Sequence, residues 1–148
     1  MDILAAENAI VARIDDQIRS STTTDFQAPK VKSFPDNPVT HFENINKTGE
    51  ILVRLDSVSA NTPEPNRTST ITQELTVNWS IYVLHRNLKA HQGVYAYIEA
   101  VKSALTGWTI TDLDDATPMW MVDTNFVEEQ GGVWIYEMSF QYTYEESE

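Results

Sequence analysis

The sequence predicts a single α+β domain in which two main helices pack on an antiparallel or mixed β-sheet. Two segments carry apolar residues at helical spacing, and several others alternate apolar and polar residues as half-buried strands do. With 148 residues, of which 41% are hydrophobic and 22% charged, the chain has the size and composition of one globular domain over residues 1–148. The expected element order is α-β-β-β-α-β-β.

The first helix is expected from about Asp2 to Arg19, because apolar residues recur there every three or four positions. This stripe consists of Ile3, Leu4, Ile10, Val11, Ile14 and Ile18, with Glu7 as its polar member. The following SSTTTD is typical of a linker, since short polar side chains compete for backbone hydrogen bonds.

The next part of the chain is expected to be rich in strands. PKVKSF predicts a short strand, and VTHFENI and EILVRLDSV flank the turn sequence NKTG as in a hairpin. The polar segment SANTPEPNRTST, residues 59–70, predicts a mobile loop. ITQELTVNWSIYVLH then alternates over about 14 residues, far beyond the usual five or six. Part of this strand, with the loop, is expected to project as an arm.

The second helix is expected from about Ala90 to Thr106, with Gly107 as its stop. MWMVDTNFVEE and VWIYEMSFQYTY predict two further strands joined by a turn at EQGG. The aromatic face of the last strand is expected to be either core or a partner surface. The acidic end, about residues 145–148, is expected to be flexible.

The charge of the chain is strongly negative and unevenly placed. The formal net charge is -12, and no Lys or Arg follows Ser103. A phosphate backbone would repel such a chain, so specific nucleic-acid binding is not expected. The sequence suggests neither a signal peptide nor a membrane helix. It has no cysteine, which excludes disulfides and suits a reducing compartment.

Enzyme signatures are missing from the sequence. There is no G-x-S-x-G elbow, no phosphate-binding glycine loop and no H-E-x-x-H, so no catalytic residue, metal ligand or cofactor is expected. A zinc site formed by His41, His85 and His91 is conceivable from residue type alone. The alternative of a small-ligand or metal-binding enzyme would use His85 and His91.

A basic cluster precedes the second helix, formed by His85, Arg86, Lys89 and His91. Cations are unfavourable at the positive end of a helix dipole, so helix capping does not explain the cluster. Two readings remain open: a solvated turn, or a contact with the acidic C-terminal segment of a neighbouring subunit.

Several motifs resemble Mu-like phage tail proteins of the tail terminator, or tail completion, family. ENAIVARI resembles the family's opening helix, VLHRNLKAHQGVYAYIEAVKSALTGW its central stretch, and GGVWIYEMSFQYTY its closing strand. The matching positions are Glu7, Arg13, Arg86, Asn87, Leu88, Gly93, Tyr95 and Gly107. The loop 59–70 and the acidic tail have no counterpart in this pattern.

The resemblance implies a structural virion protein that forms a ring, usually six-fold, at the head-proximal end of the tail. Such a ring stops growth of the tail tube and offers a docking surface to the head. The implied partners are further copies of the chain, the tail tube protein, a head-tail connector or neck protein, and a sheath protein in tails that have one. Assembly would take place in the host cytoplasm. Another connector of the tail or neck is the alternative.

The residues expected to contact other subunits or the tube are grouped by origin. Glu7 and Arg13 come from the first helix. The basic cluster contributes His85, Arg86, Lys89 and His91, and Asn87 lies within the same segment. The mobile loop contributes Arg67.

We expect the amide hydrogens of residues 59–70 to exchange rapidly in the isolated subunit and slowly in assembled particles. The segment is too polar to offset an ordering entropy of about 1–2 kcal/mol per residue by burying apolar area on its own. Hydrogen exchange read by mass spectrometry measures this. Strong protection of the segment in the isolated subunit would contradict the expectation.

Overall fold

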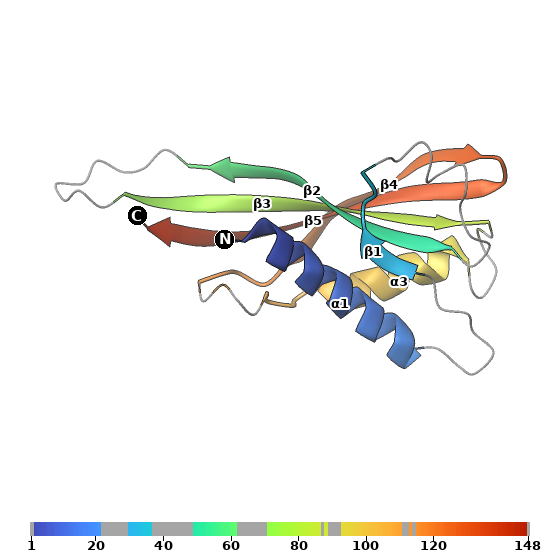
Figure 1. Cartoon of the computed structure of the whole chain (residues 1–148), viewed down its shortest axis with the longest axis horizontal. Coiled ribbons are helices and arrows are strands. Elements are labelled where there is room, and N and C mark those ends of the chain that lie inside the picture. The colour runs from blue at the N-terminus through green and yellow to red at the C-terminus, as the bar shows by residue number, and fades with distance from the viewer. Residues whose placement is uncertain are drawn as a thin grey trace.

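The computed structural model describes residues 2–21, 30–36, 49–61, 71–86, 88, 93–110, 113 and 115–147. These residues form two helices and five strands in the predicted order (Figure 1). They are α1 (Ile3–Ser21), β1 (Lys30–Ser33), β2 (Glu50–Ala60), β3 (Thr72–His85), α3 (Val94–Leu105), β4 (Trp120–Gln130) and β5 (Val133–Ser147). The α+β class expected from the sequence is confirmed.

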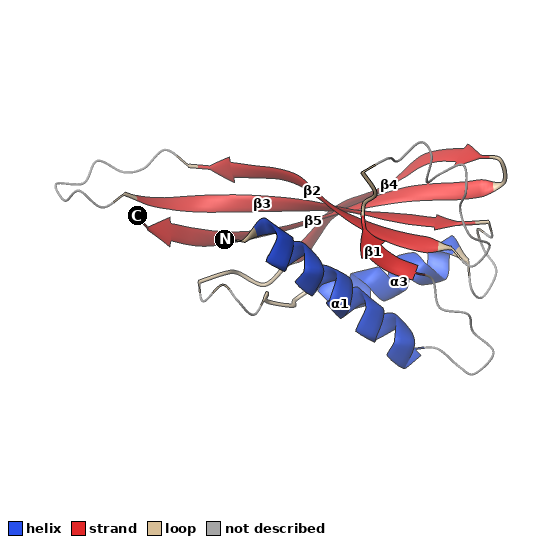
Figure 2. Cartoon of the chain, viewed as in Figure 1, coloured by secondary structure: helices blue, strands red, loops and turns tan. Residues whose placement is uncertain are grey.

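The five strands form one mixed sheet in the order β1-β2-β3-β5-β4. β1 runs parallel to β2, and the other neighbouring strands are antiparallel. Both helices lie on the same face of the sheet (Figure 2). α1 packs on β1, β2 and α3, whereas α3 packs on β3, β4 and β5. The architecture is therefore two layers, with the helices covering one face.

The main core lies between the helices and the sheet. Val94, Tyr97, Val101 and Leu105 of α3 are buried in it, together with the deeper part of the α1 stripe and the apolar face of β3. Trp79 is fully buried at its centre, and its indole N–H donates a 3.4 Å hydrogen bond to the Tyr142 hydroxyl. Met138 and Phe140 of β5 are also fully buried. Most of the aromatic face of the last strand is therefore core.

A second, smaller cluster lies on the face of the sheet away from the helices. Leu52, Leu84 and Ile135 are buried there, with Phe34 and Tyr82 packed against them. By sequence alternation alone, Ile135 shares its face of β5 with the polar residues Glu137 and Ser139, so its burial is not expected from the strand by itself. The sheet is thus buried on both faces at this end, where adjacent apolar residues such as Val83 and Leu84 fall on opposite faces.

Three strands continue beyond the helices as an arm. In Figure 1 the ends of β2, β3 and β5 that carry Ala60, Thr72 and Ser147 extend past α1. Ser59 and Ala60 still pair with β3, so the predicted loop begins later than expected, and its residues 62–70 lie outside the described part of the chain. The predicted projecting arm is confirmed by this geometry.

The C-terminal strand also extends further than the sequence suggested. Glu145 and Glu146 were expected in a flexible end, but they belong to β5 and pair with Glu74 and Gln73 of β3. Backbone pairing to a neighbouring strand therefore holds an acidic stretch whose composition is typical of a free tail.

The hairpin predicted around NKTG does not match the observed pairing of β2. Its first arm, residues 39–45, lies outside the described residues. Residues 50–53 of β2 have β1 on one edge, in parallel, and β3 on the other. Both edges next to the proposed turn are therefore occupied, and β2 begins from Gly49 with a positive φ of 84°.

We expect Gly49→Ala to destabilise the fold more than Gly107→Ala does. Both glycines have φ near +80°, a conformation that costs an L-residue about 1–2 kcal/mol. At Gly49 an added Cβ would also lie 2.5 Å from His85 Cδ2 and 2.8 Å from the Leu84 carbonyl oxygen, whereas at Gly107 it would meet nothing within 4 Å.

Thermal unfolding of the two variants measures the difference, because the strain from φ is common to both. The melting temperature of Gly49→Ala should fall clearly below that of Gly107→Ala. Equal melting temperatures would show that β2 and the end of β3 are not packed as closely as described.

Candidate assembly interface

The histidines that the sequence offered for a metal site do not support one among the described residues. Among them, no group of three or more His, Asp and Glu side chains could hold a metal ion. His85 is only 5% exposed. Its ring packs against Tyr97, with 5.3 Å between the ring centroids, and lies over Gly49. His41 and His91 fall outside the described part of the chain. His85 therefore belongs to the core of its own subunit, although it was expected at a contact surface.

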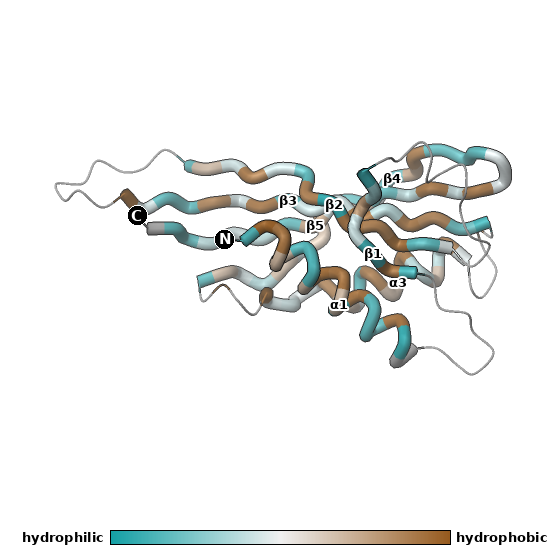
Figure 3. The backbone as a smooth tube through the Cα atoms, viewed as in Figure 1, coloured by the Kyte–Doolittle hydropathy of each residue, from teal (hydrophilic) through white to brown (hydrophobic). Residues whose placement is uncertain are grey.

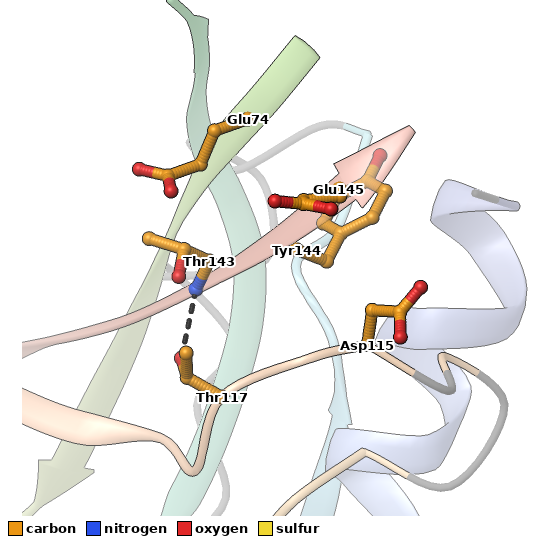
Figure 4. A pocket seen from close by; sticks show the side chains of 6 residues that line it. All are labelled: Glu74, Asp115, Thr117, Thr143, Tyr144 and Glu145. Atoms are coloured by element: carbon orange, nitrogen blue, oxygen red, sulfur yellow. Dashed lines mark hydrogen bonds between the residues drawn. The ribbon is translucent and has the colours of Figure 1, made fainter. Parts of the chain in front are cut away.

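An open pocket of about 330 Å³ lies where the loop before β4 meets the arm. Figure 4 shows the carboxylates of Glu74, Asp115 and Glu145 around it, while the Thr143 backbone N–H donates a 3.0 Å hydrogen bond to Thr117 Oγ1. Glu74 and Glu145 are direct cross-strand partners, an unfavourable placement for like charges. Three carboxylates in its lining make the pocket unfavourable for anions.

Arg86 is exposed at the end of β3, as expected of a contact residue. Its Nη1 donates a 3.4 Å hydrogen bond to the Gly131 carbonyl in the turn between β4 and β5. That turn has positive φ at Gly131 and Gly132, and the Glu129 carboxylate accepts the Gly132 N–H at 2.6 Å. No described carboxylate forms an ion pair with Arg86. Its charge is thus presented to solvent beside the β4–β5 turn.

Arg13 has partners within its own chain. Its Nε donates a 2.9 Å hydrogen bond to the Ala104 carbonyl, and its guanidinium lies 5.7 Å from the centre of the Trp108 ring. This contact joins α1 to the end of α3, because backbone carbonyls in the last turn of a helix lack intrahelical donors. Glu7 is half-buried on α1. Both residues remain predicted contact sites, and Arg13 has a structural role as well.

Four residues of the predicted contact set lie outside the described residues: Arg67, Asn87, Lys89 and His91. The structure thus describes Arg86 and His85 of the basic cluster and separates them, one at the surface and one in the core.

The sequence did not point to β4 as a contact surface, yet β4 is the most exposed strand. It lies at the edge of the sheet, and its apolar stretches 120–122 and 126–127 are separated by the polar stretch 123–125 (Figure 3). Trp120, Val122, Phe126 and Val127 are large apolar residues that stay exposed, Phe126 by 52%. The signal was present in MWMVDTNFVEE, which has apolar residues on both faces, but only the sheet order shows that this strand is at an edge.

Phe126 belongs to an aromatic group at the start of α3. Its ring centroid is 5.4 Å from that of Tyr136 and 6.0 Å from that of Trp134, and Tyr95 lies 6.2 Å from Tyr136. Burial and the neighbouring Tyr95 hydroxyl raise the pKa of Tyr136 above its ordinary value. Exposed aromatic groups of this kind are common anchors in protein interfaces. Together with Arg86, they make this end of the sheet a candidate assembly interface.

Comparison with solved structures finds the same fold in a chain of a virion particle. A chain from the "Virion of native gene transfer agent (GTA) particle" has a TM-score of 0.58 and 15% identity, with 99% of this chain and 100% of that chain covered. At this identity the likeness shows the fold alone.

Comparison of the sequence with curated proteins finds no match. The model of the Gp37 protein family, in contrast, matches residues 23–144, which is most of the chain. The chain therefore belongs to the Gp37 protein family, a family of phage proteins.

Proposed function

We propose that this protein is a structural subunit of a phage or phage-like tail, and that its copies form a tail terminator ring at the head-proximal end of the tail tube. The observation that carries the proposal is the likeness of fold, over 99% of this chain, to a chain of a virion particle. Membership of a phage protein family and the resemblance to tail terminators support the same function.

The geometry suits a subunit that works through its surfaces. The described residues form one long sheet with an arm at one end and an exposed apolar edge strand at the other. A head-to-tail interface between two different surfaces closes into a ring when the rotation between copies is right. A hexamer is the number that the family resemblance suggests. One rim of the ring would bind the tail tube and stop its growth, and the other would bind the head connector or neck.

The alternative function is another connector of the tail or neck, which would use the same kinds of surface. Imaging of particles that lack this protein separates the two. A missing terminator should give overlong tubes, whereas a missing neck protein should give tubes of normal length without heads. Tubes of normal length joined to heads would contradict both functions. An enzyme that uses His85 is disfavoured, because that ring is buried against Tyr97.

We expect Arg86→Glu, alone or with Lys89→Glu, to weaken assembly and to leave the melting temperature nearly unchanged. Arg86 is exposed and makes one long hydrogen bond in its own chain, so its charge is available to a neighbour. Exposed ion pairs are worth only about 0–1 kcal/mol each, but a ring repeats the defect at every interface. The effect should fade as salt rises, since screening acts over about 8–10 Å.

Lys102→Glu serves as the control, because it makes the same change of charge on the exposed side of α3. Ring formation is followed by electron microscopy across a salt series, and melting is followed in parallel. If the variant with both Arg86 and Lys89 reversed formed rings as readily as the wild type at low salt, these two residues would belong to a solvated turn and not to a subunit contact.

A further inference from the structure

We propose that the β4 edge of one copy binds the β1 edge of a second copy, so that the sheet continues from one subunit into the next. β4 and β1 are the two outer strands of the described sheet, and each has one neighbouring strand. The inference rests on the proposed ring, which supplies the head-to-tail arrangement, and it names the two surfaces that meet.

The β4 edge is apolar and acidic. Asp123 and Glu128 are exposed and point to the face away from the helices, because they pair with Ser139 and Ile135 of β5, which lie on that face. Neither carboxylate forms an ion pair with a described residue. Phe126 lies between them in sequence and is half exposed, but it pairs with Tyr136 and therefore points to the opposite, helix-covered face. This edge therefore suits a partner with positive charges on the face away from the helices.

The opposite edge has the complementary chemistry. Lys30 and Lys32 alternate with Val31, which packs in the main core, so both lysines lie on the face away from the helices. Lys32 is paired at 3.3 Å with the buried Glu50, whereas Lys30 is exposed and has no acidic partner among the described residues. This edge thus carries a positive charge that its own subunit does not neutralise.

Arg54 of β2 adds a second cation on the same face. Its guanidinium lies 5.5 Å from the centres of both the Phe34 and Tyr82 rings, and the side chain is 44% exposed. Asp56 is 3.7 Å away, a loose and solvent-exposed pair. Aromatic rings beside this cation give the basic edge an apolar component as well.

The charges lie on the same face of the sheet at its two opposite edges. If a second copy continued the sheet, Asp123 and Glu128 of one subunit would come alongside Lys30 and Arg54 of the next. Two β4 edges brought together would instead place acidic strands against each other. Charge complementarity therefore favours a head-to-tail contact over a symmetric one.

The two edges also offer regular strand segments of the same length. Register shifts in β4 between Met121 and Asp123 and between Phe126 and Glu128 leave Val122 and Val127 without partners on β5. Such bulges interrupt an edge and restrict the pairing it can offer. The regular segment between them, residues 123–126, is as long as the four-residue β1.

Charge reversal tests the contact in the full-length protein. Asp123→Lys with Glu128→Lys makes the acidic edge basic, and Lys30→Glu with Arg54→Glu makes the basic edge acidic. Each double variant alone should self-associate about tenfold more weakly, or worse, as expected for two reversed pairs. A mixture of the two variants should recover association, because each reversed edge then finds its complement. The matched controls Glu99→Lys and Lys102→Glu, both exposed on α3, should leave association unchanged.

Cysteine crosslinking tests the contact independently of those variants, since the chain has no cysteine of its own. Glu128→Cys combined with Lys30→Cys should give a ladder of covalent oligomers with a short bifunctional maleimide. Glu128→Cys combined with Lys102→Cys should give none. Dimers from Glu128→Cys alone would show that two β4 edges meet each other, and would overturn the proposal.

The outcomes separate this inference from the proposed function. If rings form but no crosslinked ladder appears, and both charge reversals leave the rings unchanged, the edge-to-edge contact is refuted and the terminator role stands. A crosslinked ladder in a protein whose loss leaves tail length normal would support the contact and refute the terminator role.

Discussion

The constraint on which the rest of the structure depends is the difference in length between its strands and its helices. β3 and β5 pair from Thr72 with Ser147 to His85 with Trp134, and the 15 residues of β5 span about 50 Å. The 19 residues of α1 span only about 28 Å, and the 12 of α3 about 18 Å. Two such helices cannot cover the sheet. One end therefore projects as the arm, and the strand at the far edge stays exposed.

The charged side chains fall into two groups: those with a partner in their own subunit and those without an ion-pair partner. Arg13 is satisfied by the Ala104 carbonyl, and Lys32 by the buried Glu50. Arg86, Lys30 and the carboxylates of β4 have no ion-pair partner among the described residues. Exposed charges of both signs that the subunit leaves unpaired suit a surface that binds copies of itself, since charge steers and orients association more than it stabilises a fold.

The sequence was sufficient for what periodicity encodes. The stripes of α1 and α3 and the alternation of β3 and β5 predicted the helices, the long strands, the main core and the arm, because these depend on local spacing. Strand pairing is non-local, so the parallel contact of β1 with β2 was missed. The burial of Ile135 was missed for the same reason: on its own strand it shares a face with the polar residues Glu137 and Ser139, whereas in the sheet it pairs with the buried Leu84. For the candidate site, residue type pointed to Arg86 correctly as an exposed cation, but it could not place His85 in the core or β4 at an edge.

The central claim is that this chain is a subunit that assembles with copies of itself into a closed oligomer. The most direct test is the mass of the purified protein in solution. The account predicts a single oligomer whose mass is a small whole multiple of 16.8 kDa at low salt, with smaller species appearing as salt weakens the charged contacts. A closed ring should keep the same mass as protein concentration rises further. A protein that remains at 16.8 kDa at high concentration and low salt, or that grows into open chains without limit, would contradict it.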